Sequence, residues 1–158
     1  HYITGEKIPE KIIEKIKESS TFNEGYACNR QLGFGFLDMA WHTITAPVNN
    51  DIETFESAAM EKTELFQPLT GSNMSVSFSH IFAGGYAAGY YGYKWAEVLD
   101  ADAFKYFKET GIFNSETASA FRKNILEKGA TDKPMNLYIS FRGKEPTIDA
   151  FLERSGFK

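Results

Sequence analysis

Cysteine is almost absent from this chain of 158 residues, and histidine is scarce. The single cysteine, Cys28, excludes a disulfide within the chain and a zinc cage built from cysteines. The three histidines are His1, His42 and His80; none is followed by glutamate and no two lie four residues apart, so the chain has no HExxH zinc helix. We therefore expect no complete metal site on this chain.

Long apolar runs and a basic charge excess are also missing. No apolar run is long enough to span a bilayer, so no membrane partner is expected. The net charge of −4 argues against general nucleic-acid binding. No serine lies in a GxSxG elbow, and the spaced glycines of GFGFLD and AGGYAAGYYG do not follow a strand as a phosphate loop would. Cys28 lies in an apolar stretch, which favours a small buried residue over a nucleophile.

Helical periodicity dominates what is present, and only a brief SVSFS alternates with a period of two. Prolines, glycines and capping residues divide the chain into segments. We expect an all-α fold of six or seven helices in a single domain, residues 1–158. The predicted helices run from Pro9 to Ser19, from the cap Asn23 to Ile44, from the cap Asp51 to a stop at Pro68, from Tyr86 to Glu109, from Asn114 or Ser115 to Gly129, from Pro134 over PMNLYISF, and from Pro146 over TIDAFLERSG.

The second predicted helix is apolar on most of its surface, so we expect it to be central and buried. Gly33 and Gly35 would let another helix approach it closely, and His42 near its end is interpreted as a structural histidine. Carboxylates are expected on solvent-facing helix surfaces. In the third helix the inward side chains should be Ile52, Phe55, Ala59 and Phe66, and the outward ones Glu53, Glu56, Glu61 and Lys62.

The stretch from Phe78 to Leu99 combines a histidine, a glycine pair, four tyrosines and a tryptophan. Tyr86, Tyr90 and Tyr93 are spaced i, i+4 and i+7, so they would share one face of a helix. Their hydroxyls would project together as neutral donors, which suits gripping peptide carbonyls or donating to an oxyanion. The alternative is that the rings only pack between helices, with their hydroxyls bonded to backbone. The opposite face is expected to pack and comprises Tyr91, Trp95, Val98 and Leu99.

The segment HIFAGGYAAGYYGYKWAEVLDADAF, together with FRGKEPTIDAFL near the C-terminus, resembles the C-terminal end of the thimet oligopeptidase family of zinc metallopeptidases. The resemblance covers essentially the whole chain and is strongest to the bacterial branch of oligopeptidase A and peptidyl-dipeptidase (dipeptidyl carboxypeptidase). It implies the C-terminal helical lobe of a zincin-type oligopeptidase, in a fold of two helical lobes around a deep channel.

The family's catalytic signature, HExxH with a downstream glutamate ligand, does not occur here. The resemblance implies that it lies upstream of His1, so we expect an excerpt of a larger enzyme that hydrolyses short peptides. The implied cofactor is zinc in the intact enzyme, with none bound by this chain and no activity of this chain alone. The implied partners are the upstream zinc-bearing part of the same polypeptide and short peptides, and the expected location is cytoplasmic.

The resemblance also implies roles for residues of the central stretch. His80, Tyr86 and Tyr93 match family positions that face the zinc and contact substrate, so we expect them to bind the scissile or neighbouring carbonyl and the tetrahedral oxyanion. The full predicted substrate-binding set is His80, Gly84, Gly85, Tyr86, Tyr90 and Tyr93. Two other interpretations stay open: a metal-free helical peptide-binding or interaction module, and a structural helical domain with an aromatic core.

Overall fold

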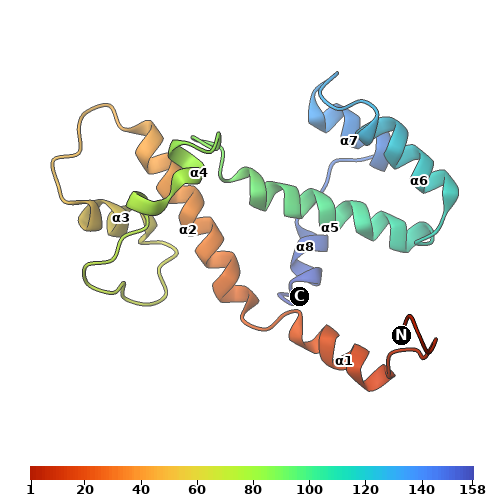
Figure 1. The fold of residues 1–158 in the computed structure, drawn as a ribbon. Coiled ribbons are helices and arrows are strands. Elements are labelled where there is room, and N and C mark those ends of the chain that lie inside the picture. Colours follow the sequence, from red (N-terminus) through yellow and green to blue (C-terminus); the bar gives the residue numbers. More distant parts are fainter. The chain divides into compact units, whose positions relative to one another are not determined.

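The computed structural model describes residues 1–158 and contains eight α-helices and no strand (Figure 1), which confirms the all-α class. A 3-10 turn spans Ser75–Ser77, and a π-helical turn, Arg122–Leu126, continues α6. The α-helices are α1 (Glu10–Ser19), α2 (Glu24–Thr43), α3 (Ile52–Met60), α4 (Ser79–Phe82), α5 (Gly92–Thr110), α6 (Ser115–Phe121), α7 (Pro134–Arg142) and α8 (Asp149–Arg154).

The chain divides into two compact units, His1–Lys94 and Trp95–Lys158. Helix α5 begins in the first unit and continues into the second. The single domain expected over residues 1–158 stays a prediction. None of the helices combines the length and the apolar character that crossing a bilayer requires.

Several helices begin where local signals place them. The Asp51 side chain accepts the Thr54 amide at 2.8 Å at the start of α3, and this backbone bond, with one from the Thr54 hydroxyl, lowers the pKa of Asp51. Asn114 likewise accepts two first-turn amides of α6, and Pro134 opens α7. Asn23 was expected to cap α2, but it has a left-handed backbone (φ 58°) and makes no side-chain cap bond.

Helix α3 differs from its prediction. It ends at Met60 rather than near Pro68, and Phe66, expected to face inward, is 73% exposed. Glu56, expected to face solvent, is buried and accepts the amides of Met74 and Ser75 at 2.7 and 2.5 Å. The 67–77 loop folds back on α3, and burial of Glu56 follows because its carboxylate satisfies two amides of that loop.

The core of the first unit lies where α2 meets α3, the 3-10 turn and α4. Gly33 permits α2 to approach the end of α3 closely, because a Cβ at Gly33 would lie 2.8 Å from the Thr63 hydroxyl oxygen and 3.0 Å from the Met60 methyl. Helix α2 is nevertheless only partly buried, and α1 buries no residue at all. The buried cluster consists of Phe34, Leu37, Phe78 and Ile81, with Trp41, Phe55, Ala59, Met60, Met74 and Tyr90 packed against it.

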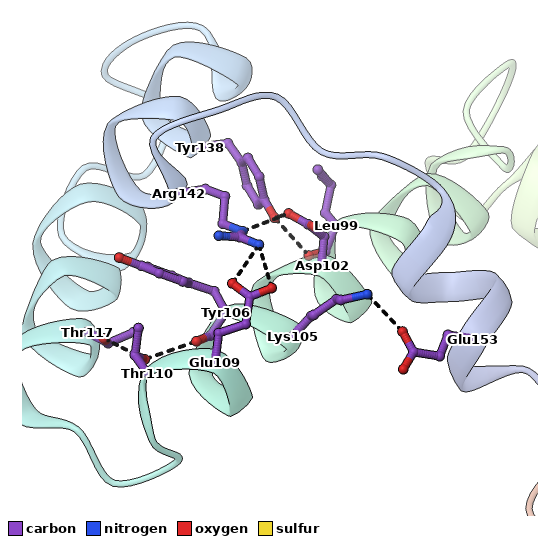
Figure 2. A network of polar contacts seen from close by, with 10 residues as sticks. All are labelled: Leu99, Asp102, Lys105, Tyr106, Glu109, Thr110, Thr117, Tyr138, Arg142 and Glu153. Carbon is purple, nitrogen blue, oxygen red and sulfur yellow. Dashed lines mark hydrogen bonds and ion pairs between the residues drawn. The ribbon is translucent and has the colours of Figure 1, made fainter.

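The second unit has its own core around Ala103, Tyr138 and Phe141 and a polar network beside it (Figure 2). The Tyr138 hydroxyl donates to Asp102 Oδ2 at 2.6 Å, and Arg142 Nε donates to the same oxygen at 3.2 Å. Burial, followed by the bond to Asp102, raises the pKa of Tyr138. Asp102 and Glu56 therefore depart from the expectation that carboxylates lie on solvent faces.

Candidate active-site surface

Four aromatic side chains of the central stretch converge in the first unit. The rings of Tyr86 and Tyr93 stack at 4.9 Å between centroids, and Tyr90 lies 5.1 Å from Tyr93. The His80 ring lies 6.1 Å from Tyr86 and 6.4 Å from Tyr90. The structure thus brings together the histidine and three tyrosines that the sequence singles out.

The backbone that carries these rings is not the predicted helix. Helix α5 begins at Gly92, so Tyr93 is helical while Tyr86 and Tyr90 lie in a loop of residues 83–91, which we call the tyrosine loop. Gly85 (φ 81°) and Ala88 (φ 53°) have left-handed backbone conformations that an α-helix does not accommodate. The i, i+4, i+7 spacing predicted the right neighbours, but turns rather than a helix face bring them together.

The two glycines of the loop have different roles. A Cβ on Gly84 would lie 2.8 Å from His80 Cα and 2.9 Å from its carbonyl oxygen, so only glycine fits against α4 there. Gly85 has open space around it but needs its positive φ. The loop then closes on α4, because the Tyr86 amide donates to the His80 carbonyl at 3.1 Å.

The three tyrosines differ in how exposed their side chains are and in what their hydroxyls bind. Tyr86 is 38% exposed and Tyr93 is 41% exposed. A hydrogen bond with Tyr86, followed by partial burial, raises the pKa of Tyr93, so its hydroxyl stays protonated at neutral pH and can donate. Tyr90 is partly buried, which raises its pKa, and its hydroxyl donates to Gln31 Oε1 at 3.2 Å. No hydroxyl of this cluster has the buried, backbone-bonded geometry that a purely structural aromatic core predicts.

The face expected to pack is only partly buried. Val98 is buried, and Leu99 packs against the core of the second unit. Tyr91 and Trp95 are 61% and 48% exposed, so the prediction that they pack is wrong for these two. Tyr91 precedes α5, and its orientation follows the turn rather than the helical periodicity that the prediction assumed.

Asp38 is the residue that sequence reasoning missed. Its side chain is fully buried in α2, and its two carboxylate oxygens accept the amides of Ala88 and Tyr90 at 2.9 and 2.8 Å. His42 Nδ1 lies 2.8 Å from Asp38 Oδ1 and 2.8 Å from the Asp38 carbonyl oxygen, which supports a structural role for this histidine. The available signal was an acidic residue within an otherwise apolar stretch, FGFLDMAW.

The residues present do not form a zinc site. No group of three or more histidine, cysteine, aspartate or glutamate side chains is placed so that it could hold a metal ion. Cys28 is a free, partly buried thiol. The side chains exposed at this surface, the phenols of Tyr86 and Tyr93 and the imidazole of His80, can donate hydrogen bonds.

Comparison with known proteins assigns the chain to a family. The family model for peptidase family M3 matches residues 1–157, and the chain belongs to that family. This confirms the resemblance seen in the central stretch and near the C-terminus.

Individual relatives agree with this assignment. The chain is 43% identical over 160 residues to oligopeptidase A of Escherichia coli, covering 100% of this chain and 23% of that protein. It is 42% identical over 161 residues to the probable cytosolic oligopeptidase A of Arabidopsis thaliana, covering 99% of this chain and 23% of that protein. It is 38% identical over 158 residues to the dipeptidyl carboxypeptidase of Salmonella typhimurium, covering 99% of this chain and 23% of that protein. The chain thus spans less than a quarter of the length of these relatives.

Proposed function

We propose that this chain is the substrate- and oxyanion-binding part of a zinc-dependent peptidase that hydrolyses short peptides. Membership of peptidase family M3 supports the reaction class. The single observation that carries the role of this chain is the pair of exposed, stacked phenols of Tyr86 and Tyr93 with the His80 ring beside them.

Peptide hydrolysis passes through a tetrahedral intermediate whose former carbonyl oxygen bears negative charge. Protonated Tyr93, held next to Tyr86, can donate a hydrogen bond to that oxygen as the charge develops. Tyr86 can donate to the same oxygen or to a neighbouring carbonyl. Such donors act mainly on turnover, because the charge they stabilise is greatest in the transition state.

The remaining members of the cluster bind and frame the substrate. His80 is exposed, so its imidazole can bond a peptide carbonyl next to the scissile bond. Gly84 and Gly85 bring backbone close to that position without side chains. Tyr90 supports the ring of Tyr93 from the protein side, because Gln31 already engages its hydroxyl.

We also propose that zinc and its ligands come from a part of the polypeptide outside residues 1–158, since the residues here do not form a ligand set. Zinc would supply activation of the hydrolytic water. This chain alone would then be inactive and would bind no stoichiometric zinc. A cytoplasmic location is the corresponding proposal, in line with the name of the cytosolic Arabidopsis relative.

The test uses the intact peptidase and a series of hydroxyl deletions. Tyr93→Phe and Tyr86→Phe should each lower kcat by about 10²–10³ while leaving the zinc content unchanged. Tyr91→Phe is the matched control, because Tyr91 is a neighbouring exposed tyrosine outside the cluster. It should retain full turnover.

Near-normal kcat in both Tyr86→Phe and Tyr93→Phe would overturn the assigned roles. An intact protein that binds peptides with zinc chelated but cleaves none with zinc restored would instead support the metal-free binding module. Cleavage of short peptides that chelation abolishes and zinc restores is the result that the proposal expects.

A further inference from the structure

The tyrosine loop is attached to the rest of the first unit through one buried side chain. Asp38 is 0% exposed, and it bonds amides that follow it by 50 and 52 positions in the chain, those of Ala88 and Tyr90. Both carboxylate oxygens are used, one for each amide. A buried carboxylate requires such partners, so the loop amides and the carboxylate satisfy each other.

The Ala88 and Tyr90 amides donate to Asp38 and to no carbonyl within the loop. Gly89 and Gly92 donate to the carbonyls of Tyr86 and Gly89, at 2.9 and 3.0 Å, as successive turns require. Ala88, which precedes Gly89, has a positive φ of 53°, which is unfavourable for a residue with a side chain. The bond from Ala88 to Asp38 offsets this unfavourable conformation and keeps the loop in this shape.

Tyr86 depends on this shape more than Tyr93 does. Tyr93 is the second residue of α5, whereas Tyr86 has no helix to hold it and lies two residues before Ala88. One end of the short segment from Tyr86 to Tyr90 is tied to the His80 carbonyl, and the other end is tied to Asp38. Loss of the second tie would free the Tyr86 ring to leave its stacked position on Tyr93.

We infer that Asp38 is a positioning residue of this peptidase site: its buried carboxylate holds the tyrosine loop so that the Tyr86 hydroxyl stays beside that of Tyr93. The inference rests on the proposed function of these two tyrosines. Asp38 itself contacts no substrate, and His42 is its third partner, at 2.8 Å from Oδ1. The effect of Asp38 on catalysis therefore passes through Tyr86.

The test is a double-mutant cycle in the intact peptidase. Asp38→Asn keeps the size of the side chain but replaces one acceptor oxygen with an NH₂ group that faces an amide. It should lower kcat by about 10- to 100-fold with a much smaller change in KM, because a misplaced donor is lost chiefly in the transition state. In the Asp38→Asn background, Tyr86→Phe should lower kcat only a few-fold, against about 10²–10³ in the wild type.

The matched control is Asp102→Asn. Asp102 is also a buried acid, 4% exposed, but it binds Tyr138 and Arg142 and no part of the tyrosine loop. Its variant should lose thermal stability and yet show an undiminished effect of Tyr86→Phe. If Tyr86→Phe costs the same factor in the Asp38→Asn background as in the wild type, Asp38 is merely structural and the inference fails.

Amide hydrogen exchange tests the inference without any activity measurement. In the wild type, the Ala88 and Tyr90 amides should be protected although they lie in a non-helical loop, and Asp38→Asn should accelerate their exchange. Exchange of these two amides at the unprotected rate in the wild type would overturn the inference, and that measurement needs no folded variant. If Tyr86→Phe leaves kcat unchanged while the Ala88 and Tyr90 amides are protected, the proposed function is overturned and the anchoring by Asp38 still holds.

Discussion

Tyr86 and Tyr93 stack with their ring centroids 4.9 Å apart and their planes inclined by 21°, although only Tyr93 belongs to a helix. The loop supplies one phenol and the start of α5 supplies the other. This pairing places two phenol hydroxyls at one exposed surface, and the hydrogen bond between them is the largest cause of the raised pKa of Tyr93.

Removal of the Tyr86 hydroxyl should lower the pKa of Tyr93. The hydrogen bond with Tyr86 is the largest cause that raises this pKa above the ordinary value of 10.0. A raised pKa keeps Tyr93 protonated below pH 10 and delays its loss of the proton as the pH rises. In Tyr86→Phe the ionisation of Tyr93 should move back toward 10.0, as followed by NMR of labelled tyrosine rings. Tyr91→Phe, the control, should leave the pKa of Tyr93 unchanged. If Tyr86→Phe also leaves it unchanged, the hydrogen bond with Tyr86 is not what raises this pKa.

Substitution of either loop glycine, Gly84 or Gly85, by alanine should destabilise the protein, but for a different reason at each position. Gly84→Ala places a Cβ 2.8 Å from His80 Cα, so backbone must shift, and turnover of the intact enzyme should fall together with stability. Gly85→Ala meets no neighbour but adopts a φ of 81°, which costs about 1–2 kcal/mol of stability. Gly92→Ala is the control, with open space and no positive φ, and should be neutral or stabilising. Thermal unfolding and kcat of the three variants check this order; a Gly84→Ala enzyme with normal kcat would refute it.

Arg142→Met should be among the most destabilising changes in the second unit. The side chains of Arg142 and Asp102 are 6% and 5% exposed, and the substitution leaves the Asp102 charge buried with Tyr138 as its remaining side-chain partner. Breaking a buried pair in this way costs about 3–5 kcal/mol of unfolding free energy, measured by urea denaturation. Arg154→Met breaks a pair with Asp100 in which both side chains are more than 40% exposed, and it should cost no more than about 1 kcal/mol. Equal losses for the two variants would rule out this account of the network in Figure 2.

Glu56→Gln should destabilise the first unit and loosen the 67–77 loop. The buried carboxylate accepts the amides of Met74 and Ser75, and a glutamine keeps only one acceptor oxygen for them. An unsatisfied buried donor costs about 1–3 kcal/mol. Glu61→Gln, an exposed acid at the end of the same helix, should change stability by less than about 0.5 kcal/mol. Urea denaturation and hydrogen exchange of the loop measure both effects, and exchange as slow as in the wild type would count against the role of Glu56.

Local signals in the sequence were sufficient for much of the helical framework. Asp51, Asn114 and Pro134 begin helices because a side-chain cap or a fixed φ acts within one turn of its own position. The motif around His80 and the tyrosines likewise pointed to the family and to the aromatic cluster. Both kinds of signal are contained in a short stretch of chain.

Local sequence signals do not predict the structure where segments distant in the chain meet. Helical periodicity predicts that α5 begins at Tyr86, but the left-handed backbone of Ala88 prevents a helix there. Alanine has no preference for that conformation, and the bond to Asp38 of α2 holds it. The helical pattern predicts that Glu56 faces solvent, because it gives no sign of the two amides that Glu56 binds. Those amides belong to residues 18 and 19 positions later in the chain. Neither partner can be recognised from the residue's immediate neighbours.

The amino-acid sequence by itself determined the family, the all-α class and the identity of the clustered aromatic side chains, because these are carried by short motifs and local periodicity. Only the tertiary structure decided that Tyr86 reaches Tyr93 from a loop rather than along a helix face. The physical reason is the buried carboxylate of Asp38, whose hydrogen bonds join segments 50 and 52 positions apart and have no local signature.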